Sequence, residues 1–115
     1  MKLIDSQHTN LLSRAMDAYT LRQKAIASNV ANINTPGYKK LEVPFEQELQ
    51  KAAASSMGSQ DIENVSFEMQ QTGEDVLLED EMLELADTQI RVQMVARSLR
   101  HSFQLMKQGI TGRTQ

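Results

Sequence analysis

The chain has 115 residues, 40% hydrophobic and 23% charged, a composition too apolar for a wholly disordered protein. Its 12 basic and 15 acidic residues give a formal net charge of −3, which argues against a nucleic-acid binder held by cation–phosphate contacts. The absence of cysteine excludes a disulfide framework, a thiolate metal site and a cysteine nucleophile.

The N-terminal residues do not have the pattern of a cleavable secretory signal. Met1-Lys2-Leu3-Ile4-Asp5 carries one positive charge and then an acid, with no apolar run behind it. No uncharged apolar stretch of about 18 residues follows, so we expect no direct membrane insertion. If the protein leaves the cytoplasm, we expect export without a cleaved signal peptide.

The first predicted element is a helix over residues 6–34. Its apolar positions follow heptad spacing, which keeps one stripe facing a partner helix: Leu12, Met16, Tyr19, Ile26, Val30 and Ile33. Pro36 ends the run, because the residue before a proline is pushed out of the α region. Thr35-Pro36-Gly37-Tyr38 is typical of a turn, in which proline presets φ and glycine is free to take a positive φ.

The middle, residues 35–75, has weaker signals and is predicted to be largely irregular. Pro44 can open a short helix that runs to Ala54. Residues 55–59 are rich in serine and indicate a loop. Apolar and polar residues alternate from Val65 to Met69, which permits a short strand or hairpin of marginal stability. We expect this region to be the least ordered part of a free monomer.

The last predicted element is a helix over residues 76–110, with the most regular pattern in the chain. Its seam repeats in steps of three and four: Met82, Leu85, Gln89, Val92, Ala96, Leu99, Phe103, Met106 and Ile110. The fold class is therefore predicted as mainly α, a single domain over 1–115. Its two long terminal heptad helices form an antiparallel coiled-coil-like pair around a short middle.

Each terminal helix offers more than one apolar face. In the last helix, Leu83, Ala86, Ile90 and Val95 lie off the main seam, so a simple hairpin would leave apolar surface wet. We expect neighbouring molecules to complete the core. The alternative is a monomeric helical hairpin or small bundle whose stripes pack only on each other.

Charge is segregated along the last helix. Residues 74–87 hold 7 acids and no base, and residues 88–115 hold 5 bases and no acid. This pattern complements the helix dipole. It also permits head-to-tail contacts, in which the acidic end of one subunit meets the basic end of the next along a filament.

No constellation for catalysis, metal binding or cofactor binding is found. His8 and His101 stand alone, without the His-Glu-x-x-His spacing of a zinc site, and the glycines are scattered singly rather than forming a phosphate loop. The bases of the last helix do not line one face and lack aromatic residues for stacking, so nucleic-acid binding is a weak alternative. The chain is predicted not to be an enzyme.

The stretch from Ala31 to Tyr38 carries a family signature. Ala31-Asn32-Ile33-Asn34-Thr35-Pro36-Gly37-Tyr38 closely resembles the Ala-Asn-x-x-Thr-Pro-Gly-Tyr motif of bacterial flagellar rod and hook proteins, which lies at the end of their N-terminal helix. The matching residues are Ala31, Asn32, Thr35, Pro36, Gly37 and Tyr38. The run from Gly73 to Met82 is similar to the opening of the C-terminal helix in a proximal rod protein. Residues 41–71 match nothing specific, and FlgC, usually somewhat longer, is the nearest alternative.

The resemblance implies a structural subunit of the proximal rod of the flagellar basal body. Such subunits polymerise through their terminal helices into a torque-transmitting shaft around an export channel, and their long helices commonly order only on assembly. The implied partners are copies of itself, the rod proteins FlgC, FlgF and FlgG, the adaptor FliE, the MS ring and the type III export apparatus, in a periplasmic assembly with helical order. The residues expected to carry helix packing and assembly are Leu12, Met16, Tyr19, Ile26, Val30, Met82, Leu85, Val92, Leu99, Phe103, Met106 and Ile110. From another class, a helical adaptor that binds an amphipathic helix of a soluble partner is the alternative.

Overall fold

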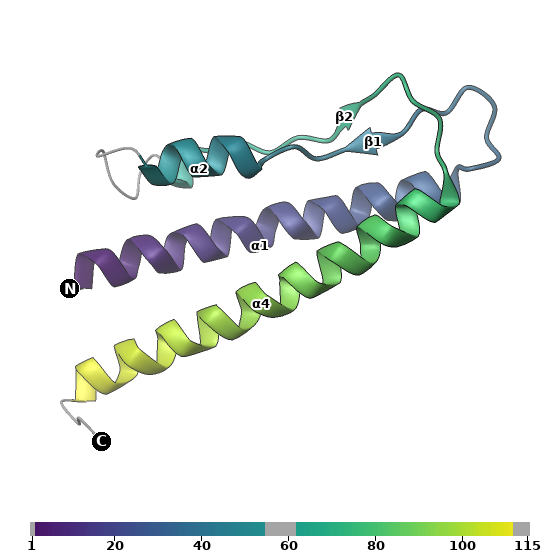
Figure 1. Ribbon diagram of the computed structural model, residues 1–115. Helices are drawn as coiled ribbons and strands as arrows, with labels where there is room; N and C mark the ends of the chain where they lie inside the picture. The colour runs from purple at the N-terminus through teal and green to yellow at the C-terminus, as the bar shows by residue number, and fades with distance from the viewer. Residues whose placement is uncertain (1, 55–61, 112–115) are drawn as a thin grey trace.

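Two long helices set the shape of the molecule. The computed structural model describes residues 2–54 and 62–111, with α1 at Lys2–Ala31 and α4 at Leu78–Thr111. Figure 1 shows the two helices running antiparallel, with both chain termini at the same end of a body of 60 × 30 × 14 Å. The predicted fold class is confirmed. Within the described ranges, no helix has an apolar window long enough to cross a bilayer.

The N-terminal helix ends at Ala31, earlier than the predicted residue 34. The amide of Asn32 still donates to the carbonyl of Ser28 at 3.0 Å, but the next bonds span only three residues, from Ile33 to Val30 and from Thr35 to Asn32. The side chain of Asn32 also donates to the Ser28 carbonyl at 2.9 Å and so competes with the helical pattern. The helix therefore changes into a turn before Pro36.

The middle of the chain lies along α1, on the side opposite α4 in Figure 1. It consists of β1 (Leu41–Glu42), α2 (Glu46–Ala54) and β2 (Gln70–Gln71), and the two strands pair antiparallel, Leu41 opposite Gln71. The short helix and the hairpin match the predicted fold class. The loop predicted at 55–59 lies outside the described residues.

The strand position predicted at Val65–Met69 is wrong, because pairing begins only at Gln70. The alternation there has another cause. The carbonyl of Val65 accepts a hydrogen bond from the Arg14 side chain, and Phe67 packs edge-on against Phe45 with ring centroids 5.6 Å apart. The Arg14 guanidinium of α1 also lies 4.4 Å from the Phe67 ring centroid, so both residues face α1 without a partner strand.

The apolar core lies between α1 and the middle segment. Tyr19 packs edge-on against Phe45 at 5.0 Å between centroids, and the guanidinium of Arg22 lies 4.6 Å from the Phe45 centroid. The buried core residues come from both regions: Ala18, Tyr19, Ala25, Val43, Phe45, Leu49 and Ile62. The middle, weak as a sequence signal, therefore supplies much of the packing that holds α1.

Candidate functional site

The motif turn after α1 is closed by its own side chains. The Thr35 hydroxyl donates to Asn32 Oδ1 at 3.1 Å, and the amide of Tyr38 donates to the Thr35 carbonyl at 3.2 Å. Gly37 sits between them with φ at +80°, in the left-handed region that strongly favours glycine. The turn brings Tyr38 back against the end of α1.

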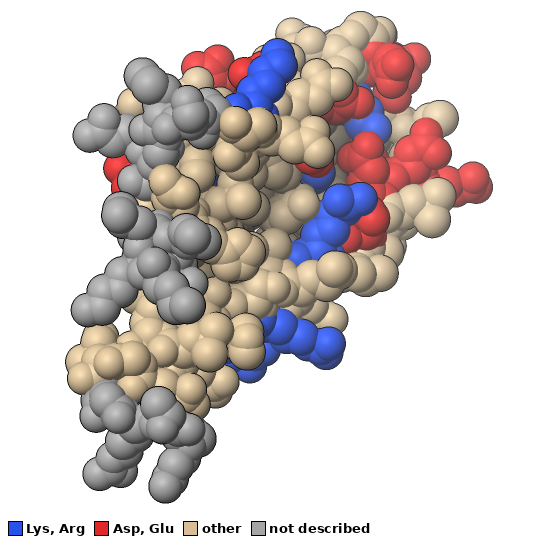
Figure 2. All heavy atoms as spheres, turned by 60° about the vertical axis from the view of Figure 1, so that its left-hand side comes forward, with Lys and Arg blue, Asp and Glu red and all other residues tan. Residues whose placement is uncertain are grey.

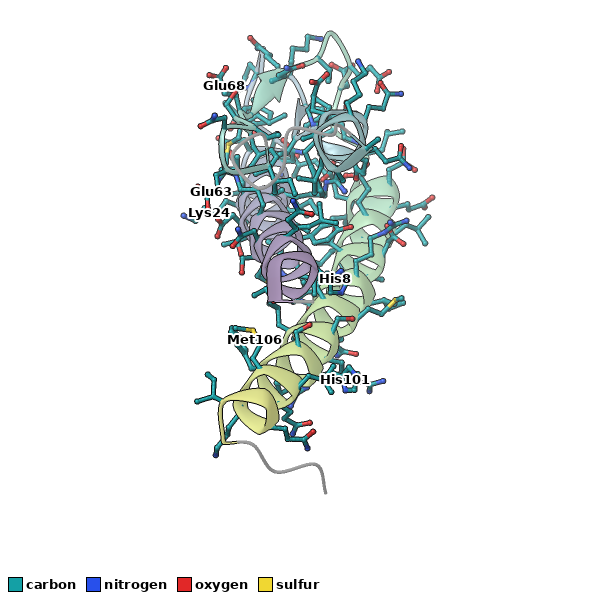
Figure 3. All side chains as sticks on the ribbon, turned by 90° about the vertical axis from the view of Figure 1, so that its left-hand side faces the viewer. His8, Lys24, Glu63, Glu68, His101 and Met106 are labelled. Atoms are coloured by element: carbon teal, nitrogen blue, oxygen red, sulfur yellow. The ribbon has the colours of Figure 1, made fainter. Side chains whose placement is uncertain are left out.

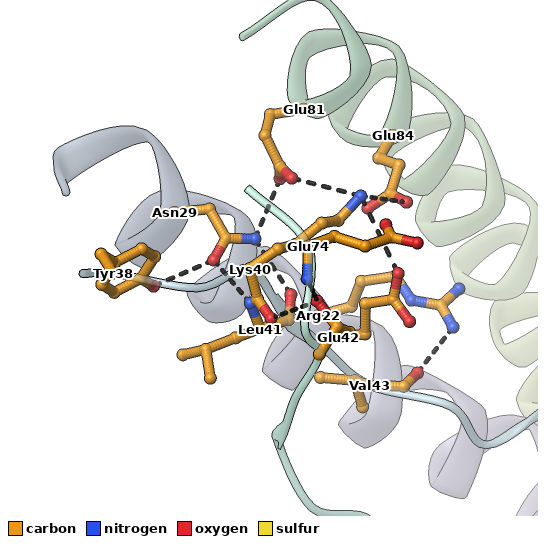
Figure 4. A network of polar contacts seen from close by, with 11 residues as sticks. Arg22, Asn29, Tyr38, Lys40, Leu41, Glu42, Val43, Glu74, Glu81 and Glu84 are labelled. Atoms are coloured by element: carbon orange, nitrogen blue, oxygen red, sulfur yellow. Dashed lines mark hydrogen bonds and ion pairs between the residues drawn. The ribbon is translucent and has the colours of Figure 1, made fainter. Parts of the chain in front are cut away.

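Asn29, two residues before the end of α1, is the centre of a buried polar network. Its side chain is fully buried and pairs with the backbone of Leu41 in both directions, accepting from the amide and donating to the carbonyl at 2.9 Å each. The Tyr38 hydroxyl donates to Asn29 Oδ1 at 2.9 Å and also contacts the Ser28 hydroxyl. Asn29 Nδ2 further donates to Glu81 Oε2 of α4 at 3.2 Å, as Figure 4 shows.

Lys40 carries the charge at the centre of this network. Its ammonium lies 3.3 Å from a carboxylate oxygen of Glu81 and 3.3 Å from one of Glu84, and only 7% of Lys40 and 0% of Glu81 are exposed. The contact with Glu81 Oε1 is an ion pair without hydrogen-bond alignment. Burial alone would lower the pKa of Lys40, but the carboxylates of Glu84 and Glu81 outweigh it and raise the pKa above its usual value.

The backbone around Lys40 is held as well. Its amide donates to the Glu74 carbonyl, and its carbonyl accepts from both the amide and the hydroxyl of Thr72, all at 2.9 Å. At the surface, the hydrogen bond from Lys39 at 2.7 Å lowers the pKa of the Asp75 carboxyl. These contacts join the end of α1, β1, the chain after β2 and the start of α4 into one unit, which we call the motif clamp (Asn29, Tyr38, Lys40, Leu41 and Glu81).

The motif residues predicted from the sequence fall at the entrance to this clamp. Tyr38 belongs to it directly, Asn32, Thr35, Pro36 and Gly37 shape the turn that positions it, and Ala31 is the exposed last residue of α1. Sequence reasoning missed Lys40 and Glu81 as partners. Glu81 was one of several acids at the start of a helix, and nothing local marks the one that is buried.

Gly37→Ala tests the turn. No heavy atom lies within 4 Å of the added Cβ, so any cost comes from the positive φ alone. We expect the free energy of unfolding to fall by about 1–2 kcal/mol. Gly37→Asn is the matched control and should lose less, because asparagine tolerates this conformation better. Equal losses in urea unfolding would show that the positive φ is not the reason for the glycine.

On α1, the predicted packing residues lie inside. Tyr19 and Ile26 are buried, and Leu12, Met16 and Val30 are half-buried. The two helices also touch near the chain termini, where Thr9 Oγ1 of α1 lies 3.9 Å from the Met106 sulfur of α4. Whether these residues also serve assembly stays a prediction.

On α4, the stripe that faces α1 is rotated from the predicted seam. It runs in steps of four and three through buried and half-buried residues: Glu81, Leu85, Thr88, Val92, Val95, Leu99 and Ser102. The predicted residues Leu85, Val92 and Leu99 belong to it. The other predicted seam residues on α4 are exposed in the single chain: Met82, Gln89, Phe103, Met106 and Ile110, with Ala96 half-buried between them.

An apolar surface is left uncovered along α4. The most exposed of its large side chains are Ile110 at 78%, Leu83 at 71% and Met94 at 62%, and Ile90 and Phe103 are more than half exposed. Figure 3 looks along the molecule from the end where the termini lie, and α4 extends there away from α1 with side chains on its free side. An uncovered apolar surface of this kind is typical of an interface.

Comparisons with known proteins point to one family. Residues 10–39 match the family described as flagella basal body rod protein. The chain is 33% identical to the flagellar basal body rod protein FlgB of Bacillus subtilis (strain 168), over 90% of this chain and 89% of that protein. FlgB of Borrelia hermsii is 42% identical over 50 residues, 44% of this chain and 37% of that protein. FlgB of Borreliella burgdorferi is 49% identical over 39 residues, 34% of this chain and 29% of that protein.

Proposed function

The chain belongs to the family of flagellar basal body rod proteins named FlgB, and from this premise we propose that it is a structural subunit of the proximal rod. In this proposal, copies polymerise through α1 and α4 into the shaft that transmits torque and surrounds the export channel. The observation that carries the proposal is the uncovered apolar side of α4, from Leu83 to Ile110.

The energetics favour assembly. Fully burying one large aliphatic or aromatic side chain contributes about 1.5–3 kcal/mol. Several such residues stay exposed on α4, although the helix already packs against α1. Contacts with neighbouring subunits would bury them, and the far ends of the helix pair would then become firmly ordered only in the assembly.

The motif clamp suits a shaft that must carry torque. Ion pairs and hydrogen bonds fix the register of α1 against α4 at one end of the molecule. A twisting load on one helix is thereby passed to the other, because these contacts keep the two helices from sliding past each other. A purely apolar seam resists such sliding less well. This role needs no catalytic group, and we propose none.

We further propose the location and the partners of the subunit. It would lie in the periplasmic part of the basal body, reached through the type III export apparatus without a cleaved signal. There it would contact the rod proteins FlgC, FlgF and FlgG, the adaptor FliE and the MS ring. Membership of the family supports the assembly with basal body components.

Deletion and complementation test the proposal. We expect a strain that lacks this chain to be non-motile and to form no rod, and the chain supplied in trans to restore both. A tagged copy should co-purify with basal bodies and appear at the membrane-proximal end of the rod in images of them. Complete rods in the deletion strain would contradict the proposal.

A further inference from the structure

A cleft lies beside the motif clamp, between α1, α4 and the segment around β1. Its volume is about 320 Å³, and its apolar lining includes Ala25, Ile26, Leu41 and Val43. Carboxylates surround it: Glu42, Glu46, Glu84 and Asp87 all line the cleft, against the single cation Arg22. Figure 4 shows Arg22, Glu42 and Glu84 on this side of the clamp.

The nearby cations do not neutralise all of these carboxylates, so the mouth of the cleft, which we call the rim, is negative. Arg22 lies 2.6 Å from Glu46, and partial burial, which would raise the pKa of Glu46, is outweighed by this hydrogen bond, which lowers it. Lys40 is shared among Glu81, Glu84 and, at 3.9 Å, Glu42. Asp87 is paired with Arg91 at 2.8 Å. One ammonium cannot neutralise the three carboxylates of Glu42, Glu81 and Glu84, so the rim stays negative and attracts a further cation.

A buried hydroxyl in the cleft wall lacks a partner. Thr88 lines the cleft and is 1% exposed, and its Oγ1 accepts and donates no hydrogen bond within the described residues. An unpaired buried hydroxyl is unfavourable, and its oxygen can accept a hydrogen bond from an ammonium or guanidinium group. The carboxylates thus favour a cation in the cleft, and this hydroxyl oxygen offers an acceptor to a donor group there.

The same chain carries a matching surface on the C-terminal half of α4. Arg97 follows Met94 by three residues and Ile90 by seven, so the three share one exposed face. Among residues 7–54 and 62–110, no carboxylate lies within ion-pair distance of Arg97 or Arg100. In Figure 2, acidic side chains gather in the upper half, whereas the charged side chains visible in the lower part are basic.

We propose that the cleft receives Arg97 of a second copy of this chain, with Ile90 and Met94 of that copy against its apolar lining. A copy does not fill its own cleft this way, because its Arg97 lines a separate hollow beside His8, towards the opposite end of the helix pair. Cleft and arginine are therefore different surfaces, and in the proposed rod their contact is heterologous and repeats from copy to copy. The inference rests on the proposed function, since it assumes that copies assemble.

Cysteine cross-linking in basal bodies tests the contact directly, because the chain has no cysteine of its own. Two differently tagged copies are co-expressed, one with Pro44→Cys at the cleft and one with Gln93→Cys, one turn before Arg97. After oxidation we expect a species that carries both tags. Lys24→Cys replaces Pro44→Cys in the control, and Figure 3 places Lys24 on the side of α1 away from α4; it should give no mixed species.

Charge exchange supplies the second readout. Arg97→Glu should reduce the cross-link about tenfold, and Glu42→Arg should do the same, whereas the two changes on opposite copies should restore it. Both residues are exposed, and because Glu42 also lies 3.9 Å from Lys40, urea unfolding of Glu42→Arg checks that the chain remains folded. A cross-link indifferent to both changes overturns the inference. So does its absence from basal bodies that contain both copies, a result that leaves the rod function intact.

Discussion

Lys40→Met should lower the free energy of unfolding by about 3–5 kcal/mol, the usual cost of removing one partner from a buried ion pair. The reason is Glu81, which has no exposed surface and would keep a carboxylate with only the Asn29 amide as a partner. Losing the Lys40 ammonium costs less free energy at Glu84, because 43% of the Glu84 side chain is exposed and water can solvate it. Urea unfolding of the full chain measures the loss, and amide exchange at Leu41 and Thr72 locates it.

The neighbouring lysine provides a matched control. Lys39 pairs with Asp75 at 2.7 Å, but the two side chains are 40% and 80% exposed, and we expect Lys39→Met to cost less than about 1 kcal/mol. The double change Lys40→Met with Glu81→Gln should recover most of the loss, since glutamine keeps an acceptor for Asn29 without the charge. Equal effects of Lys39→Met and Lys40→Met would show that the buried pair does not hold the clamp.

The helices were predictable because their periodicity is local. Steps of three and four mark a stripe wherever it lies, and both long helices were found from such steps. Which stripe faces the partner is a different matter. Leu85, Val92 and Leu99 belong to two overlapping heptad patterns on α4, one completed by Met82 and Phe103 and one by compact polar residues such as Thr88 and Ser102.

The single chain uses the second pattern. Thr88 and Ser102 are buried against α1, whereas Met82 and Phe103 stay outside. Apolarity alone favoured the larger residues, and the sequence has no information about how much apolar surface is kept for neighbours. An inference from hydrophobicity therefore finds the helix correctly and misjudges which of its sides faces α1.

Only the turn that leads into the motif clamp could be predicted from the sequence. The turn from Asn32 to Tyr38 uses local chemistry, proline and glycine in sequence, and was recognisable. The bond between Asn29 and Glu81 joins residues 52 positions apart, and no local pattern marks Lys40 as the residue that lies between them. Long-range polar contacts leave no periodic trace, so the fold has to be known before they can be named.

Phe103→Asp should abolish rod assembly and motility while leaving the isolated chain nearly as stable as before. Phe103 is 54% exposed on α4, so an aspartate there is solvated in the single chain and costs little. Within a packed seam between subunits, the same charge would be buried without a partner, at a cost of several kcal/mol. Swimming in soft agar and recovery of rods from purified basal bodies measure the assembly, and urea unfolding measures the chain.

Two companion changes separate assembly from folding. Leu99→Asp places the charge on the stripe that already faces α1, and we expect it to weaken the isolated chain as well as the rod. Gln104→Asp adds the same charge at the neighbouring exposed polar position and should leave motility normal. If cells with Phe103→Asp swim normally, the exposed side of α4 near its C-terminal end is not an interface. If Phe103→Asp unfolds the isolated chain as Leu99→Asp does, the residue belongs to the internal seam, and its exposure in the single chain has no bearing on assembly.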